Sequence, residues 1–266
     1  MRALIFRIAV VVLIAGIAVI GYLLAQQNHT LRNANSRIAS LTSDITTLEN
    51  SLKTLEGDIS QINPVLQSHI NATVNLVKVI QPVITRISVN GDGFAVSGSG
   101  FIIRSDGYVL TNQHVIDAAQ SITLTLSNGD KYIGTVISAD NTRDLALLKM
   151  DTARTDFPVA TLALTSDIIV GDDVVACGFP LGLNLPGPAS FTRGIISAIR
   201  TLNGLNFVQT DCEIDPGSSG GCLVNLNNEV VGMTSDAVLP PQQNLESIAL
   251  AIPVGDMRSF VQNNLK

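Results

Sequence analysis

The sequence predicts an all-β domain of two antiparallel β-barrels with a short C-terminal helix, preceded by a transmembrane helix and a coiled-coil stalk. Three observations lead to this expectation: an uncharged apolar run opens the chain, a heptad pattern follows it, and short strand-like segments separated by turns fill the remainder. A chain of 266 residues can hold one double-barrel domain and an accessory segment. We expect an anchor over residues 1–27, a stalk over 28–66, a linker over 67–78 and the folded domain over 79–266.

The apolar run covers residues 8–25 and follows Arg2 and Arg7. Its length is near the lower limit for crossing the ~30 Å hydrocarbon core of a membrane. A cleaved signal peptide is the alternative, but the run is long for one and Leu-Leu-Ala at its end is a poor cleavage site. We therefore expect a retained single-pass anchor. Because basic residues stay on the cytoplasmic side, the N-terminus would be cytoplasmic and the folded domain extracytoplasmic.

Apolar residues then recur with alternating spacings of three and four. The series comprises Ile38, Leu41, Ile45, Leu48, Leu52, Leu55, Ile59 and Ile62. Such spacing predicts a coiled coil, and Pro64 is expected to end it. A single amphipathic helix that packs on the folded domain is the alternative, and Gly57 lowers the helix propensity of the stalk.

The folded domain is expected to consist of short strands and one closing helix. Alternation of polar and apolar residues at 122–126, a turn, and a second apolar segment at 132–137 predict a hairpin in the first barrel. The apolar spacing at the end of the chain predicts a helix over 254–265. Other strands are expected at 98–103, 108–115, 145–149, 174–178, 191–196, 207–210, 222–224, 230–234 and 248–252, with loops at 180–188 and 239–244.

Composition excludes several classes of function. The net charge is −6, the acidic excess lies after residue 78, and the chain has no Trp and no basic patch interleaved with aromatic residues. These features argue against nucleic-acid binding. Cys177, Cys212 and Cys222 show no metal-binding spacing, and neither a metal nor a cofactor is expected. Apolar strand contexts favour unpaired thiols, and one disulfide plus a free thiol is the alternative outside the cytoplasm.

Three polar motifs occur in a fixed order. The segment GSGFII at 98–103 precedes TNQHV with His114, Asp144 opens an apolar strand, and Ser219 lies in TDCEIDPGSSGG at 210–221. A serine beside glycines can expose its hydroxyl while nearby N–H groups meet an oxyanion. A histidine can take and return the proton, and an aspartate can orient the histidine. The order predicts a catalytic triad as in chymotrypsin-like barrels, not as in α/β-hydrolases or subtilisins.

Each candidate residue also has a purely structural interpretation. His114 could be a structural histidine, Asp144 could cap a turn, and Ser219 could be a loop serine of a protein that holds peptides without cleaving them. The occurrence of all three in one order favours the catalytic interpretation. The other two histidines, His29 and His69, precede the folded domain.

Together these motifs resemble those of the HtrA/Deg family of trypsin-like serine proteases. The motifs of that family look like GSGF, TNxHV, DxAxL and TDxxxNPGNSGGPL. The resemblance covers residues 79–263. It implies two chymotrypsin-like barrels and a serine endopeptidase that cleaves unfolded or exposed segments of extracytoplasmic proteins through an acyl-enzyme. It further implies a homotrimer and an oxyanion hole at Gly217, Ser218 and Ser219.

The serine segment departs from the family pattern at three positions. Asp215 and Ser218 each stand in place of Asn, and Cys222 stands in place of Pro. The resemblance places Ile214 toward the substrate pocket, which favours small or medium aliphatic side chains. Glu213 occupies the position of the acidic residue in the trypsin pocket, and it would instead favour basic side chains.

Two further classes of function remain open beside an enzyme. One is a catalytically silent, membrane-tethered scaffold that binds peptides on a protease fold, and the other is an assembly protein whose stalk is its main function. Isoleucine and leucine in the heptads favour a parallel dimer, whereas the resemblance implies trimers formed near residues 79–96. We expect a trimer, because Leu52 and Ile62 interrupt the dimer pattern. No PDZ domain is expected after the closing helix.

Overall fold

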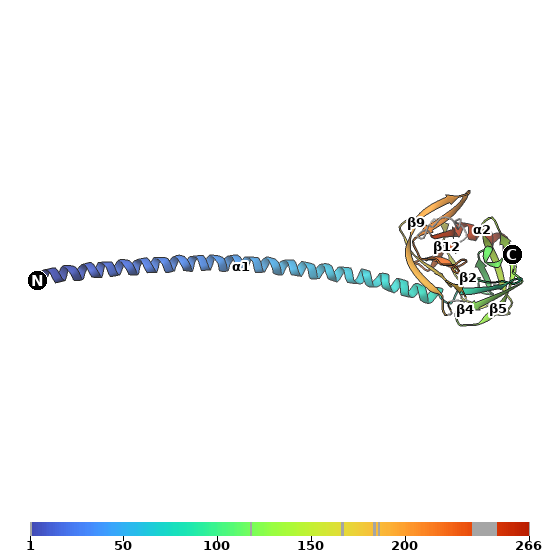
Figure 1. Cartoon of the computed structure of the whole chain (residues 1–266), viewed down its shortest axis with the longest axis horizontal. Helices are drawn as coiled ribbons and strands as arrows, with labels where there is room; N and C mark the ends of the chain where they lie inside the picture. Colours follow the sequence, from blue (N-terminus) through green and yellow to red (C-terminus); the bar gives the residue numbers. More distant parts are fainter. Residues whose placement is uncertain are drawn as a thin grey trace. The chain divides into compact units, whose positions relative to one another are not determined.

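The computed structural model describes residues 2–117, 119–165, 168–182, 185, 187–235 and 249–265. The chain divides into two units, Met1–Ser68 and His69–Lys266. The described part of the first unit is helical, and all described strands belong to the second (Figure 1). The loop expected at 239–244 lies outside the described residues.

Helix α1 runs from Arg2 to Ile80 (Arg2–Ile80) and includes Pro64. The helix therefore continues past Pro64, and the expectation that the coiled coil ends there stays a prediction. A proline inside a helix removes one hydrogen bond and costs about 3 kcal/mol. Beyond it, Leu76 and Ile80 are buried in the core of the second unit, and burying each stabilises that unit by about 1.5–3 kcal/mol. Residues 67–78, expected as a linker, are helical, and the proposed domain limits stay a prediction.

Two apolar segments of α1 are exposed in the single chain. The helix holds an 18-residue window of mean hydropathy 2.1, which by length and composition is able to cross a membrane. The heptad residues from Ile38 to Ile62 are each 56–67% exposed. Exposed apolar rows of this kind need a partner or a membrane to cover them. The coiled coil itself stays a prediction.

The first barrel is closed and antiparallel. Its strand order is β1 (Ile84–Asn90), β2 (Ala95–Arg104), β3 (Tyr108–Thr111), β6 (Leu145–Met150), β5 (Lys131–Asp140) and β4 (Ser121–Leu126). In β4 each second residue is buried, as the alternation of its sequence predicts for a strand with one face on a core. The expected hairpin of the first barrel is thus confirmed as β4 and β5.

The second barrel has six strands closed by pairing of the first with the last. The order is β11 (Cys222–Asn225), β8 (Asp173–Gly178), β9 (Ser190–Leu202), β10 (Leu205–Thr210), β13 (Ala249–Pro253) and β12 (Glu229–Ser235), and the short β7 (Thr161–Leu162) adds to β12 in parallel. The expected closing helix is confirmed as α2 (Val254–Asn264), which buries Val254, Met257 and Phe260. The predicted double-barrel fold is correct.

The two barrels share a hydrophobic core. Phe101, Leu110 and Leu145 of the first barrel belong to the same buried cluster as the strands of the second barrel. Figure 1 shows β2, β4 and β5 in one part of the domain and β9 and β12 in the other. Because the shared core fixes one barrel against the other, residues from both can form a single site.

Candidate active site

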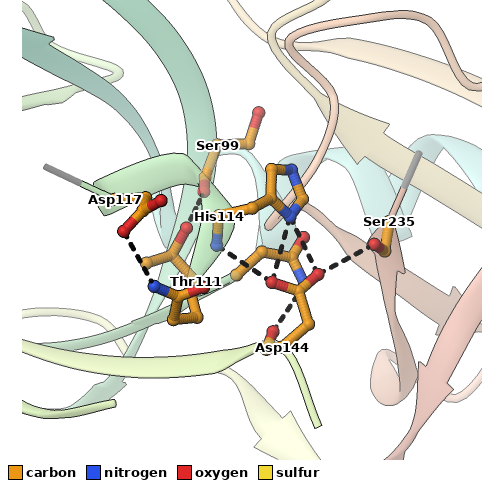
Figure 2. A network of polar contacts seen from close by, with 8 residues as sticks. Ser99, Thr111, His114, Asp117, Asp144 and Ser235 are labelled. Carbon is orange, nitrogen blue, oxygen red and sulfur yellow. Dashed lines mark hydrogen bonds and ion pairs between the residues drawn. The ribbon is translucent and has the colours of Figure 1, made fainter. Parts of the chain in front are cut away.

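His114 and Asp144 meet because adjacent strands deliver them. His114 opens the 3-10 helix η1 (His114–Ile116) shortly after β3 ends, and Asp144 directly precedes β6. The two strands are paired, with Thr111 opposite Ala146. His114 Nδ1 lies 2.8 Å from Asp144 Oδ2 and 3.0 Å from Oδ1, and the His114 backbone N–H donates to Oδ1 at 2.9 Å (Figure 2).

The backbone of Asp144 is held in an uncommon conformation. Its φ is +55°, in the left-handed region that aspartate tolerates better than most residues. The Asn112 amide donates to the Asp144 carbonyl at 2.9 Å, and Asn112 is fully buried. This bond fixes the turn that points the carboxylate at the imidazole.

Ser235, at the end of β12, is a third partner of the same carboxylate. Its hydroxyl donates to Asp144 Oδ2 at 3.0 Å, and the residue is 4% exposed. Figure 2 shows this side chain beside the carboxylate, on a strand separate from the segment that carries His114. Because Ser235 belongs to the second barrel, the Asp144 carboxylate accepts hydrogen bonds from both barrels. Sequence reasoning missed Ser235, because no local motif marks it.

Ser219 lies on the loop between β10 and β11 and is 2% exposed. The Ser99 N–H of β2 donates to the Ser219 carbonyl at 2.8 Å. The next residue, Gly220, has a φ of +83° and donates its N–H to the Thr234 carbonyl at 2.9 Å. A Cβ at Gly220 would lie 2.1 Å from the Ser99 carbonyl oxygen, so only glycine fits there. The serine turn is thus fastened to both barrels.

Gly217 is the second glycine that the serine loop requires. Its φ is +97°, and a Cβ on it would lie 2.7 Å from the Phe179 carbonyl oxygen. The Ser99 hydroxyl donates to the Gly217 carbonyl at 2.8 Å and accepts from the Phe179 N–H at 2.8 Å. One hydroxyl of the first barrel therefore ties together two loops of the second.

Of the three residues expected at the oxyanion hole, Ser218 has its N–H engaged in the turn. This group donates to the Asp215 carbonyl at 2.9 Å, and the Ser218 carbonyl accepts from the Thr234 hydroxyl at 2.7 Å. The Ser218 N–H is therefore committed to the turn and is not a candidate oxyanion donor. The N–H groups of Gly217 and Ser219, on either side of it, are the candidates.

A recess of about 150 Å³ lies beside the serine loop. Both predicted pocket residues, Ile214 and Glu213, line it, together with Ala176, Gly178 and Ser218. Ile214 is half-buried and packs against the core, whereas Glu213 is exposed. The walls are thus mainly small or apolar, and two exposed carboxylates, those of Glu213 and Asp215, also line the recess.

A second hollow, of about 320 Å³, adjoins His114 and Asp144. Leu202, Leu205 and Phe207 of the β9–β10 hairpin supply its apolar lining. Across the residues that the structure describes, no group of three or more His, Cys, Asp or Glu side chains is arranged to hold a metal ion.

The trypsin-like class is defined by a double barrel in which one barrel carries a carboxylate–imidazole pair and the other carries a serine flanked by glycines. The sequence profile of the trypsin-like peptidase domain matches residues 98–233. The chain therefore belongs to the trypsin-like peptidase family, and its relatives are of the HtrA/Deg type.

Two curated relatives illustrate this similarity. The periplasmic pH-dependent serine endoprotease DegQ of Escherichia coli is 41% identical over 158 residues, which cover 58% of this chain and 33% of DegQ. The serine protease Do-like HtrB of Bacillus subtilis is 34% identical over 166 residues, covering 59% of this chain and 35% of HtrB. The chain thus matches only about a third of the length of these relatives.

Solved structures show the same similarity. The HtrA-type protease AlgW with a tripeptide superposes with a TM-score of 0.64 at 33% identity, covering 71% of this chain and 62% of AlgW. The serine endoprotease from Yersinia pestis gives a TM-score of 0.62 at 33% identity, with 71% and 65% coverage.

Proposed function

We propose that this protein is a membrane-anchored serine endopeptidase that cleaves unfolded or exposed segments of extracytoplasmic proteins. The observation that carries the proposal is the contact of the Asp144 carboxylate with His114 Nδ1 at 2.8 Å. Ser219, the proposed nucleophile, lies in a turn that hydrogen bonds hold to both barrels. The relatives named as serine endoproteases support this activity.

In the proposed mechanism, the contact with Asp144 fixes the tautomer of His114. A proton on Nδ1 donates to the carboxylate and leaves the lone pair of Nε2 available. Nε2 takes the proton of the Ser219 hydroxyl as its oxygen attacks the peptide carbonyl carbon, and it then gives this proton to the leaving amine. Water hydrolyses the resulting acyl-enzyme by the reverse sequence of proton transfers.

The oxyanion of the tetrahedral intermediate would be stabilised by two N–H groups. We assign this role to Gly217 and Ser219, because the Ser218 N–H between them is bonded to the Asp215 carbonyl. The left-handed backbone at Gly217 supports this assignment, since it turns the peptide away from the geometry of an ordinary strand. Loss of one such donor typically costs 10²–10³ in turnover.

The recess beside Ser218 would take the substrate side chain that precedes the scissile bond. Ile214, Ala176 and Gly178 favour a small or medium aliphatic side chain there. The exposed Glu213 gives a weaker preference for a basic one, because its carboxylate is screened by water. The apolar hollow at Leu202, Leu205 and Phe207 would hold an apolar residue further upstream.

The proposed placement is a single-pass protein with a cytoplasmic N-terminus. The apolar window of α1 and the basic residues Arg2 and Arg7 support it. Relatives named as periplasmic support an extracytoplasmic protease domain. The exposed heptad row from Ile38 to Ile62 supports assembly, and we propose a homotrimer in which copies cover that row.

The test uses the full-length chain in detergent micelles, incubated with casein and, separately, with a fluorophosphonate probe. We expect casein cleavage and covalent labelling of Ser219, with both lost in Ser219→Ala. A folded protein that neither cleaves casein nor reacts with the probe would instead be the silent peptide-binding scaffold. Light scattering on the same sample tests the trimer, and a monomer would contradict the coiled coil.

A further inference from the structure

Two buried cysteines face each other across neighbouring strands. Cys177 of β8 and Cys222 of β11 are direct partners in the antiparallel register. Their side chains are 2% and 0% exposed, and their sulfur atoms lie 2.9 Å apart without a bond between them. The protease mechanism uses neither residue.

The geometry of this pair suits a disulfide. Directly opposed residues of an antiparallel pair have Cα atoms about 4.5–5.5 Å apart, inside the range of about 4.4–6.8 Å that disulfides span. The sulfur atoms are already within about 1 Å of the bonded length of about 2.05 Å. The third cysteine, Cys212, is also buried, and its sulfur faces the Val174 carbonyl at 3.8 Å. Cys212 is therefore the cysteine that would stay outside a Cys177–Cys222 bond.

We propose that Cys177 and Cys222 form a structural disulfide when the domain folds in an oxidising compartment. The inference rests on the proposed extracytoplasmic placement, because cytoplasmic thiols are kept reduced. The oxidant is the disulfide of a thiol–disulfide exchange partner. One cysteine thiolate attacks that disulfide and releases one partner thiol, and the second cysteine displaces the other. One S–S bond forms, one is broken, and the two thiol protons leave with the partner's two thiols.

The bond would form during folding and not afterwards. Burial and the neighbouring Cys177 raise the pKa of the Cys222 thiol well above its ordinary value, so the folded barrel keeps Cys222 in its unreactive thiol form. Burial also excludes the exchange partner. Once closed, the bond is protected from reductants because burial keeps an attacking thiolate away from its sulfur atoms.

The cross-link would tie together two parts of the site. Cys222 directly follows Gly221, at the end of the serine turn, and Cys177 lines the recess together with Gly178. The residues between the two cysteines include all of β9 and β10. Closing so long a loop restricts the unfolded chain far more than it restricts the folded barrel.

Peptide mapping tests the bond directly. The full chain is exported by a bacterial host, alkylated with N-ethylmaleimide under denaturing conditions and digested without reductant. Trypsin separates Cys177 from the other two cysteines at Arg193, and a Glu-specific protease separates Cys212 from Cys222 at Glu213. We expect a linked Cys177–Cys222 peptide, lighter by two hydrogens than its parts, and an alkylated Cys212.

Three alkylated cysteines, or a bond that contains Cys212, would overturn the proposal. Cys212→Ala is the matched control and should keep the linked peptide, whereas Cys177→Ala should leave Cys222 alkylated. The mapping does not depend on proteolytic activity, so an absent bond and an absent protease are separate results.

Thermal unfolding gives a second readout. Protein that is reduced while unfolded and refolded in reductant should melt about 5–15 °C below the oxidised protein. The double variant Cys177→Ala/Cys222→Ala should melt at one temperature under both conditions. Equal melting temperatures of oxidised and reduced wild-type protein would show that the Cys177–Cys222 bond does not stabilise the domain.

Discussion

The two barrels contribute to the candidate site in different ways. The first supplies His114 and Asp144 from the ends of β3 and β6, whose direct pairing brings the two side chains into contact. The second supplies Ser219 from a loop, and this loop is held by bonds from Ser99 of the first barrel. Pairing of adjacent strands therefore brings the histidine and the aspartate together, with one added bond from Ser235 of the second barrel. The serine turn depends on contacts between the barrels.

The largest expected effect comes from the serine itself. Ser219→Ala should lower kcat by about 10⁴-fold to 10⁶-fold, because members of a triad act as a unit. The melting temperature should stay close to that of the wild type, since the change removes one hydroxyl from a turn that backbone bonds hold. Turnover of a fluorogenic peptide and thermal unfolding measure the two quantities. Residual turnover near the wild-type rate would require a different nucleophile.

The first barrel's pair is tested by Asp144→Asn. An amide keeps the shape of the carboxylate but neither fixes the productive tautomer of His114 nor stabilises its cation, so kcat should fall by about 10⁴-fold at neutral pH. The matched control is Asp140→Asn, because Asp140 lies four positions earlier and bonds to Thr142 and Arg143, not to His114. Equal losses in the two variants would contradict the assignment of Asp144.

The same difference between barrels decides what was predictable from sequence. Short sequence motifs contain His114, Asp144 and Ser219, and the residue types in these motifs indicate the catalytic chemistry. Ser235 and Ser99 do not, because they act on residues 91 and 118 positions away in the chain. Contacts of that range follow from barrel closure and register, which no local pattern contains.

The strands and the closing helix were predictable because their apolar spacing is local as well. The position at which α1 ends was not predictable from local sequence. Pro64 is a strong local signal for a helix end, but the helix continues to Ile80, where Leu76 and Ile80 bury their side chains. Tertiary burial outweighed the local preference of one proline.

A contact between barrels is tested by Ser99→Ala. The change removes the hydroxyl that donates to the Gly217 carbonyl and leaves the buried Phe179 N–H without its acceptor. An unsatisfied buried group of this kind costs about 1–3 kcal/mol, and we expect kcat to fall by about 10-fold to 100-fold with a lower melting temperature.

Ser97→Ala is the matched control for this variant. It lies on the same strand, and its hydroxyl donates to the Ile87 carbonyl within the first barrel. It should leave turnover nearly unchanged. If Ser97→Ala and Ser99→Ala lowered kcat equally, the serine turn would not depend on the contact between the barrels.

The smallest expected effect concerns the turn before Asp144. Burial of the Asp140 carboxylate opposes its ionisation, but hydrogen bonds from the Arg143 backbone and side chain and from the Thr142 N–H outweigh burial and lower the pKa of Asp140. Because the folded state has the lower pKa, the ionised carboxylate stabilises the protein above the unfolded pKa of about 3.9. This contribution is lost as the pH falls through the folded pKa.

Asp140→Asn should therefore lower the free energy of unfolding by less than about 1 kcal/mol at pH 7, since the pair is partly exposed. Urea unfolding should show a smaller difference at pH 3. Arg143→Gln should remove only part of the effect of Asp140→Asn at pH 7, because the backbone N–H groups of Thr142 and Arg143 still donate to the Asp140 carboxylate. A difference that is the same at both pH values would show that the carboxylate charge is not its source.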